Sequence, residues 1–382
     1  QVDFAAGTAY DPPGKAGTAS LTQGLIDMGV KGLDETQIAN RLADLGALLS
    51  GGADMDRASV SLRTLSDAAK RVPAVDILRA VLTTPQFPAE VLDREKARTV
   101  AALKEALTRP DSIASKAFWS AMYPTHPYGR YSTPESVAGL ERSDLLAFYQ
   151  SYFTAKRAVV TLVGDLSRKQ AEALAQLITA DLPAGGSSAA PEVPSLPAAS
   201  EKRIEHPAAQ AHLLMGLPAL KRGDPDFFPL LVGNYSLGGG GFVSRLMKEV
   251  REKRGYAYSV YSYFVTLGQP GPFQIGLQTK KEQVNDALKV TRDVLTRFLA
   301  EGPSEAELQA AKQNLVGSFP LRLDSNRKIL ENVAALGFYG LPLDYLDRYT
   351  ENVDKVTVDD IKAAFARHVK LENMVTVVVA GE

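Results

Sequence analysis

The chain has 382 residues, which is more than one ordinary hydrophobic core organises, so we expect two domains of roughly 150–200 residues each. Its 43 basic and 44 acidic residues leave a formal charge of −1, so the chain has no net field that would attract nucleic acid or anionic lipid. The lack of cysteine excludes disulfides, thiolate zinc sites and thiol nucleophiles. No run reaches the ~18 apolar residues of a membrane span. From the charge and the apolar runs together, we expect neither nucleic acid nor a membrane as a partner.

Strand and helix patterns alternate along the first half of the chain. Residues 1–7 have the pattern of the interior of a strand, so we expect an upstream segment, such as a signal peptide, to precede them. Residues 58–62 alternate apolar and polar side chains and predict a strand, and residues 76–82 predict a helix after it. The half closes on an apolar strand predicted over residues 159–164.

A segment of low complexity separates the two halves. Residues 183–200 contain four Pro, two Gly, four Ser and five Ala, a composition that neither buries a core nor propagates a helix or strand. We interpret this segment as a linker between an N-terminal domain over residues 1–182 and a C-terminal domain over residues 201–382.

The second half repeats the order of elements seen in the first. Residues 256–266 and 273–278 alternate as the two strands of a hairpin, and a helical pattern over residues 284–295 follows. Ser304 and Glu307 form a capping box that predicts the start of a further helix.

The two halves also end alike. Phe148 and Phe365 each lie sixteen residues before the glycine that closes the last apolar strand. Helix-then-strand units look similar in any α+β protein, so one match alone would mean little. Several matches in the same order on both sides of one linker favour an internal duplication. We therefore predict an α+β fold of two homologous halves, each a mixed, mainly antiparallel β-sheet covered by α-helices.

The stretch with most bearing on function lies in the second half. A helix-like segment over residues 244–250 follows a run of four glycines, and the run consists of Gly238, Gly239, Gly240 and Gly241. Arg251 and Tyr258 come next, seven residues apart. An arginine offers two parallel donors to a carbonyl group, and a phenol donates a hydrogen bond to an oxyanion. These residues are therefore candidates for binding a peptide carbonyl and stabilising developing negative charge.

Structural alternatives remain open for each of these candidates. In the structural alternative, Arg251 forms an ion pair with Glu249 or Glu252 and has no other role. Tyr256 and Tyr258 are then simply alternating side chains of one strand. The glycine run lacks the pattern of a phosphate-binding loop. It predicts either a flexible loop that meets substrate or a bend that lets the chain pass close to another backbone.

Three segments of the chain resemble the pitrilysin and mitochondrial processing peptidase family, the inverted zincins. They are residues 7–20, residues 126–129 (His-Pro-Tyr-Gly) and residues 244–255, and the resemblance spans nearly the whole chain. Active members of that family carry H-x-x-E-H after the first segment, with two zinc-binding histidines and a glutamate base.

This chain departs from the family at the zinc motif. Ser20 and Gly24 stand where the two histidines would be, and Gln23 stands where the glutamate would be. A glutamine cannot take a proton from water near neutral pH, because its amide is not basic. Glu105 is similar in place to the third zinc ligand of the family, but one carboxylate does not make a catalytic zinc site. We therefore expect no metal in this chain.

The four histidines do not replace the missing ligands. His126 lies in a turn, His206 precedes a proline, His212 lies in a strand-like segment and His368 in a C-terminal helix. None has a partner histidine at i+3 or i+4, so we interpret each as a packing or surface residue.

The resemblance implies a function that this chain would share with a partner. In the family, an arginine and a tyrosine of the C-terminal half face the zinc of the N-terminal half across a chamber and hold the substrate backbone. By the match of motif, those roles fall on Arg251 and Tyr258. In members built from two short subunits, one chain often carries zinc and the other does not. The resemblance thus implies a zinc-less subunit that pairs with a homologous zinc-binding subunit, acts on unfolded peptides and is inactive alone.

Two further functions remain compatible with the resemblance. One is a structural subunit like the core proteins of the respiratory cytochrome bc1 complex, which share this fold. The other is a peptide-binding protein that cleaves nothing. A chain without cysteine fits both cytoplasm and periplasm, and the expected upstream signal peptide slightly favours the bacterial periplasm.

Overall fold

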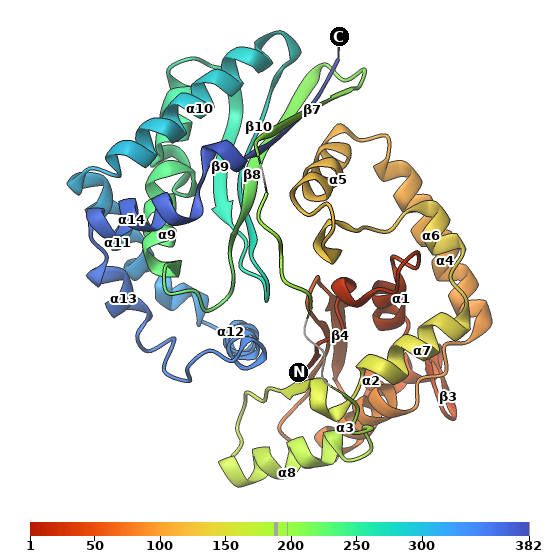
Figure 1. Cartoon of the computed structure of the whole chain (residues 1–382). Helices are drawn as coiled ribbons and strands as arrows, with labels where there is room; N and C mark the ends of the chain where they lie inside the picture. Colours follow the sequence, from red (N-terminus) through yellow and green to blue (C-terminus); the bar gives the residue numbers. More distant parts are fainter. Residues whose placement is uncertain (187–189, 197, 382) are drawn as a thin grey trace. The chain divides into compact units, whose positions relative to one another are not determined.

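The computed structural model describes residues 1–186, 190–196 and 198–381, which form two compact units (Figure 1). The first unit comprises Gln1–Lys104, Arg130–Ala190 and Leu323–Gly340, and the second comprises Glu105–Gly129, Pro191–Arg322 and Leu341–Glu382. Of the predicted linker, residues 187–189 and 197 lie outside the described residues.

The units do not follow the predicted domain limits at two places. Residues 105–129 come from the first half of the sequence but pack in the second unit, and residues 323–340 make the reverse exchange. The physical reason is that each segment carries an apolar helix face. The partners of the first segment lie in the second unit, and those of the second segment lie in the first unit. Ala117 and Phe118 are buried in the first of these segments, and Ala334 and Leu336 in the second.

The first unit is built on a four-stranded antiparallel sheet of order β4-β5-β1-β6. Phe4, Val60 and Phe148 are buried in one hydrophobic cluster between this sheet and its helices. Its regular elements are β1 (Val2–Phe4), α1 (Thr18–Gly24), β2 (Gly29–Val30), β3 (Leu33–Asp34), α2 (Glu35–Asp44), β4 (Leu48–Ala53), β5 (Ala58–Arg63), α3 (Ala68–Thr83), α4 (Ala89–Ala106, which ends in the second unit), α6 (Pro134–Ala138), α7 (Arg142–Tyr152), β6 (Ala158–Val160), α8 (Arg168–Thr179) and α12 (Asn326–Tyr339).

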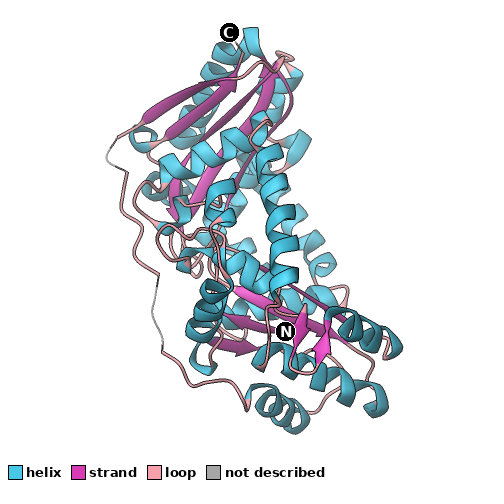
Figure 2. Cartoon of the chain, turned by 90° about the vertical axis from the view of Figure 1, so that its right-hand side faces the viewer, coloured by secondary structure: helices cyan, strands magenta, loops and turns pink. Residues whose placement is uncertain are grey.

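The second unit is built on a five-stranded sheet of order β7-β11-β8-β10-β9, whose strands and covering helices are distinguished by colour in Figure 2. Only the β7–β11 pair is parallel among the described strands of this sheet. The regular elements are α5 (Pro110–Met122), β7 (Ser200–Glu205), β8 (Gln210–Leu220), α9 (Phe227–Asn234), the π-helix η4 (Tyr235–Gly239), the π-helix η6 (Met247–Glu252), β9 (Ala257–Phe264), β10 (Gly271–Lys280), α10 (Val284–Glu301), α11 (Glu305–Ser318), α13 (Tyr349–Lys355), α14 (Val358–His368) and β11 (Val375–Ala380).

The strand orders of the two sheets correspond. Reading β9, β10, β8 and β11 against β4, β5, β1 and β6 gives the same sequence of antiparallel neighbours, with β7 added beyond β11 in the second unit. Phe148 and Phe365 are both buried at corresponding places. The predicted α+β fold of two related halves, with mainly antiparallel sheets covered by helices, is confirmed. No helix among the described residues combines the length and apolar character that crossing a membrane requires.

Two predicted elements differ from those observed. The strand expected over residues 159–164 is shorter and covers Ala158–Val160. The helix expected over residues 244–250 is largely a π-helical turn, η6, in which the Lys253 amide donates to the Lys248 carbonyl five residues earlier (3.0 Å). A π-turn contains one residue more than an α-turn, and such turns are frequent at functional sites.

Candidate functional site

The helix that carries the degenerate zinc motif, α1, begins at a buried aspartate. Asp11 accepts hydrogen bonds from the backbone amides of Gly17 and Ala19, both at 2.7 Å. These bonds satisfy amides at the start of the helix, as a capping side chain does. Burial raises the pKa of Asp11 to about 6, against the opposing effect of the two amides.

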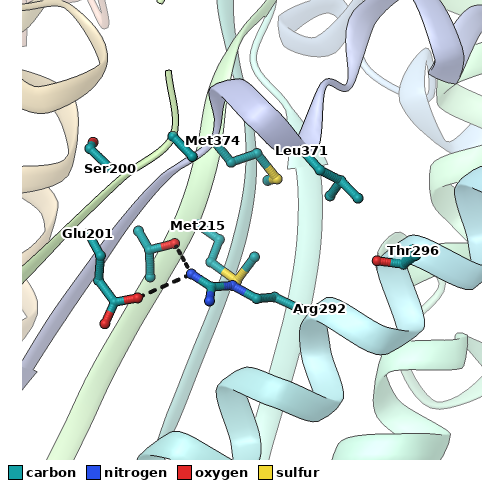
Figure 3. Close-up of a pocket in the computed structure, with 9 residues that line it drawn as sticks. Ser200, Glu201, Met215, Arg292, Thr296, Leu371 and Met374 are labelled. Carbon is teal, nitrogen blue, oxygen red and sulfur yellow. Dashed lines mark hydrogen bonds and ion pairs between the residues drawn. The ribbon is translucent and has the colours of Figure 1, made fainter.

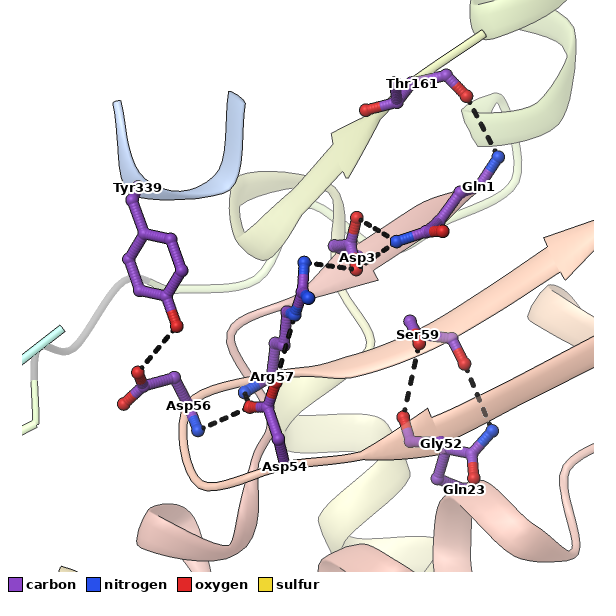
Figure 4. Close-up of polar contacts among 10 residues, drawn as sticks. All are labelled: Gln1, Asp3, Gln23, Gly52, Asp54, Asp56, Arg57, Ser59, Thr161 and Tyr339. Atoms are coloured by element: carbon purple, nitrogen blue, oxygen red, sulfur yellow. Dashed lines mark hydrogen bonds and ion pairs between the residues drawn. The ribbon is translucent and has the colours of Figure 1, made fainter. Parts of the chain in front are cut away.

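Within α1, Gln23 is a structural residue. Its side chain is buried, and its Nε2 donates to the carbonyl oxygen of Ser59 on β5 (3.1 Å; Figure 4). The backbone of Gly51 on β4 lies so close that an added β-carbon would be 2.3 Å from Gln23 Nε2. The side chain at the position of the general base therefore anchors the helix to the sheet.

The two positions of the missing histidines have different surroundings. Ser20 is exposed. A β-carbon added at Gly24 would meet no atom within 4 Å, so the space beside this residue is open. Ser20 and Gly24 are four positions apart, which puts both on one face of the helix. At these two positions the helix presents one hydroxyl and no nitrogen or carboxylate ligand.

The remaining metal candidates of the sequence do not form a zinc site. Glu105 is exposed near the end of α4. His126 accepts from the Tyr128 amide at Nδ1 (3.1 Å) and contacts the Pro191 carbonyl through Nε2 (2.8 Å). His206 likewise contacts Ala208 N and Thr108 O. Both rings are therefore held by backbone groups, as expected for packing residues.

One cluster of possible ligand atoms was not apparent in the sequence. Asp224, Asp226 and His368 bring three such atoms within 4.8 Å of one another in the second unit. However, Arg367 makes a bidentate pair with Asp226 (2.8 and 2.6 Å), and His368 Nε2 lies 2.8 Å from the same carboxylate. Asp226 is thus already neutralised by side chains of α14, and the cluster ties the end of α14 to the start of α9.

Local irregularities of the backbone place Arg251 and Tyr258. Arg251 lies in the π-turn η6. Tyr258 lies on β9 where the register with β10 shifts, because Ala257 faces Thr279 while Val260 faces Leu277. Three steps along β9 thus face two along β10, which is a β-bulge. Both Tyr258 and Ser259 are exposed at the bulge, and Tyr258 is 84% exposed.

The guanidinium group of Arg251 lies against aromatic rings and is not paired with acids. Its Cζ is 4.7 Å from the centroid of the Phe242 ring and 4.8 Å from that of Tyr258. Glu249, which the sequence offered as a partner, instead pairs with Lys253 and Arg254, both at 2.7 Å. Across residues 1–186, 190–196 and 198–381, neither the Arg251 guanidinium nor the Tyr258 hydroxyl has a hydrogen-bond or ion-pair partner.

Three of the four glycines lie in helical turns, and Gly240 joins the two turns. Gly238 and Gly239 end the π-helix η4, and Gly241 starts a 3-10 turn. A β-carbon at Gly238 would lie 2.7 Å from the backbone nitrogen of Ser262 on β9. The run therefore allows a close approach to β9, as the structural alternative predicted. Gly241 has room for a side chain but adopts φ +61°, which favours glycine.

These residues line one cavity of about 720 Å³ in the second unit. Gly238, Gly239, Gly241, Arg251 and Tyr258 all contribute to its wall. The remaining lining includes Phe242, Asn234, Tyr261, Tyr263 and Arg322, and the residues that line the cavity include no aspartate or glutamate. Of the six residues predicted to contact substrate in the second half, all but Gly240 therefore line one cavity.

A second cavity in the same unit has a different character (Figure 3). It measures about 370 Å³ and is lined by Met215, Leu371 and Met374, among others. Its arginine, Arg292, donates to Glu201 (3.2 Å) and to the Thr376 hydroxyl (3.1 Å). Because this guanidinium already has acceptors, the cavity offers less to a polar ligand than the cavity around Arg251.

The His-Pro-Tyr-Gly segment, by contrast, has a structural role. Tyr128 is buried, and its hydroxyl accepts from the Gln269 amide (3.1 Å). A β-carbon at Gly129 would lie 2.1 Å from the Tyr123 carbonyl oxygen, so only glycine fits. This segment follows α5 and holds it within the second unit.

Two family models match the chain. The model described as insulinase (peptidase family M16) matches residues 1–133, and the model described as peptidase M16 inactive domain matches residues 139–315. Among solved structures, the chain is similar to a peptidase M16 inactive domain from Pseudomonas fluorescens, with 38% identity and a TM-score of 0.95 over 100% of this chain and 92% of that chain.

Two curated relatives differ in what their names say. A non-peptidase homolog from Helicobacter pylori is 26% identical over 385 residues, which cover 99% of this chain and 88% of that protein. An uncharacterized zinc protease from Streptomyces coelicolor is 27% identical over 302 residues, which cover 76% of this chain and 65% of that protein.

Proposed function

Because the chain belongs to the M16 peptidase family, we propose that it is the zinc-less subunit of a two-chain metallopeptidase and supplies Arg251 and Tyr258 to substrate. A homologous partner subunit carries the zinc and the general base. The substrate is unfolded peptide, whose backbone carbonyls match the donors of Arg251 and Tyr258. This chain alone is inactive and holds no zinc.

The observation that carries the proposal is the state of Arg251. A guanidinium group is normally satisfied by acids or carbonyls, since it has five N–H donors. Arg251 has no such acceptor in the described part of the chain, although Glu249 is close in sequence and pairs with other cations. It lies in a cavity whose wall, among the residues that the structure describes, has no carboxylate. Such a side chain is suited to binding an acceptor that the chain itself does not contain.

Two observations on α1 support the assignment of zinc to a partner. The side-chain amide of Gln23 donates to the Ser59 carbonyl and so has a structural role. Ser20 and Gly24 place neither an imidazole nor a carboxylate at the two positions of the missing histidines. The name of the Helicobacter pylori relative, non-peptidase homolog, agrees with a chain that does not hydrolyse peptides by itself.

The test is kinetic and uses the complex with a zinc-bearing M16 subunit. Tyr258→Phe removes one exposed hydroxyl and little volume, so assembly should be unchanged while kcat for an unstructured peptide falls about 10²–10³-fold, as for loss of an oxyanion donor. Arg251→Ala should also raise KM, because a bond to a substrate carbonyl acts in the ground state as well. Tyr256→Phe, outside the cavity, is the matched control.

Two results would contradict the proposal. If the pure chain cleaves peptide at a rate insensitive to chelators, a zinc-bearing partner is not needed. If the Arg251→Ala and Tyr258→Phe complexes assemble and turn over substrate like the wild type, the chain is a scaffold or a peptide-binding protein. Size-exclusion chromatography of each complex, run beside the assays, separates lost activity from lost assembly.

A further inference from the structure

Phe242 is exposed in a way that its own packing does not explain. Its side chain is 63% exposed, directly after the glycine run. The turn that carries it is fixed on both sides, because Gly241 adopts φ +61° and the Ser244 hydroxyl and amide both bind the Gly241 carbonyl, at 2.7 and 3.0 Å. Ser244 itself is buried. The backbone thus holds a large apolar ring toward solvent at one place.

The contact that Phe242 makes is with Arg251. The Arg251 Cζ lies 4.7 Å from its ring centroid, well within the range of a cation–π interaction. A ring does not accept the N–H donors as a carboxylate or carbonyl oxygen does, so this contact leaves the donors of the guanidinium group available to another acceptor. A carboxylate in the same role would occupy those donors and neutralise the charge.

Arg245, six residues earlier, shows the alternative arrangement. Its Cζ also lies over a ring, 5.3 Å from the Phe298 centroid. However, Arg245 donates to both oxygens of Glu307 (2.9 and 2.7 Å) and to the Gly302 carbonyl (2.9 Å), so its donors serve the fold. Arg251 has contacts with two rings, those of Phe242 and Tyr258, without the acceptors.

We propose that Phe242 is a positioning residue, which holds the Arg251 guanidinium by its face so that its N–H edge is presented to a peptide carbonyl. The inference rests on the proposed function for the identity of the ligand, but the contact itself belongs to this chain. Phe242 touches Arg251, and its effect on substrate passes through that side chain.

The experiment compares Phe242→Leu, which keeps apolar volume without a π face, with Phe242→Trp, which restores a stronger one. Val243→Ala is the control, because Val243 is the next residue, is 50% exposed and does not line the cavity. In the isolated chain, NMR of the Arg251 Nε–H group should show a ring-current shift that persists in Phe242→Trp and Val243→Ala and decreases in Phe242→Leu.

In the complex with a zinc-bearing subunit, Phe242→Leu should raise KM for an unstructured peptide by roughly 2- to 5-fold, the range expected of one exposed cation–π contact, with little change in kcat. Phe242→Trp should restore the wild-type KM. In an Arg251→Ala background, Phe242→Leu should have no further effect, since coupled residues are not additive.

Each outcome decides one claim. An unchanged Arg251 resonance in Phe242→Leu, or an equal rise of KM when Arg251 is already alanine, overturns the positioning role. If the wild-type complex fails to cleave peptide but the NMR shift depends on Phe242 as described, the ring contact stands and the proposed function fails. If the complex is active and neither the Arg251 Nε–H shift nor KM changes in Phe242→Leu, the proposed function stands and this inference fails.

Discussion

Gln23 differs from a glutamate at the same position chiefly in its ability to donate a hydrogen bond. Its amide nitrogen donates to the Ser59 carbonyl across the interface between α1 and β5 (Figure 4). An ionised glutamate would place negative charge against that carbonyl in a buried position. The chemistry that hydrolysis would need at this position is therefore incompatible with the contact that the helix makes.

This contrast gives a prediction for Gln23→Glu. Loss of the donor and burial of a charge should lower the free energy of unfolding by about 1–3 kcal/mol at neutral pH. A protonated glutamate can still donate, so the deficit should be small below pH ~4 and should grow as the pH rises and the carboxyl ionises. Denaturant unfolding at several pH values measures it, with Ser20→Ala as the exposed control. A deficit that does not change with pH would contradict this account.

The position of Arg251 shows what residue patterns leave undetermined. The sequence identified Arg251 and Tyr258 and left open a pairing of Arg251 with Glu249 or Glu252. Glu249 instead binds Lys253 and Arg254, four and five residues further on. The π-turn that holds Arg251 was not predictable either, because no local pattern in residues 244–252 distinguishes an i→i+5 bond from an i→i+4 bond. The bulge at Tyr258 is likewise a matter of register with β10, which lies outside the predicted motif.

At the level of elements, the regular patterns were informative. The hairpin of β9 and β10 was predicted from alternation, and the Ser304–Glu307 capping box lies at the start of α11 as expected. Both depend on interactions within a few residues or on periodicity. The glycine run was less readable, because glycine fits a flexible loop and a close backbone approach equally well. Only the tertiary contact of Gly238 with Ser262 on β9 distinguishes the two.

The start of α1 provides a pH-dependent prediction. Burial raises the pKa of Asp11 to about 6, above the value near 3.9 of an unfolded aspartate. The folded state therefore holds this proton more tightly, so the contribution of Asp11 to stability is fully present below pH ~4 and is lost as the pH rises through 6. A shift of about two units corresponds to roughly 3 kcal/mol. Carbon-13 NMR of the Asp11 carboxyl should show a midpoint near 6.

Asp11→Asn is the matched variant for this measurement. It keeps one acceptor oxygen, as the protonated carboxyl of the wild type does at pH 4, so its free energy of unfolding should be close to that of the wild type at that pH. Between pH 4 and 7 its free energy of unfolding should lack the decline that Asp11 causes. Parallel stability profiles for the two proteins, or an Asp11 midpoint near 4, would contradict the assignment.

Across the chain, the exchange of segments between units was not predictable from local patterns. The linker composition suggested two consecutive domains, yet α5 packs on β8 and β11 in the second unit, and α12 contacts β6 in the first. Tyr123 donates to the Pro270 carbonyl (2.9 Å), and Tyr339 donates to Asp56 (2.9 Å). Such contacts join residues more than a hundred positions apart, and amphipathic helices carry no sign of which sheet they cover.

The exchange predicts how the protein behaves when cut. A chain of residues 1–182 would carry α5 without the sheet it covers and would lack α12, and a chain of residues 201–382 would have the reverse defect. The first would expose Phe118, which lies close to Gly216 on β8, and the second would expose Leu336. Because fully burying one such side chain contributes about 1.5–3 kcal/mol, neither fragment should fold cooperatively alone. Together they should associate and regain native circular dichroism and a cooperative thermal transition. The control pair is cut at the same linker but has residues 105–129 moved to the second fragment and residues 323–340 to the first. These fragments keep each unit's own helices and should each retain more structure alone than the fragments of residues 1–182 and 201–382.

If the fragments of residues 1–182 and 201–382 each unfold cooperatively on their own, α5 and α12 are dispensable for the units they join.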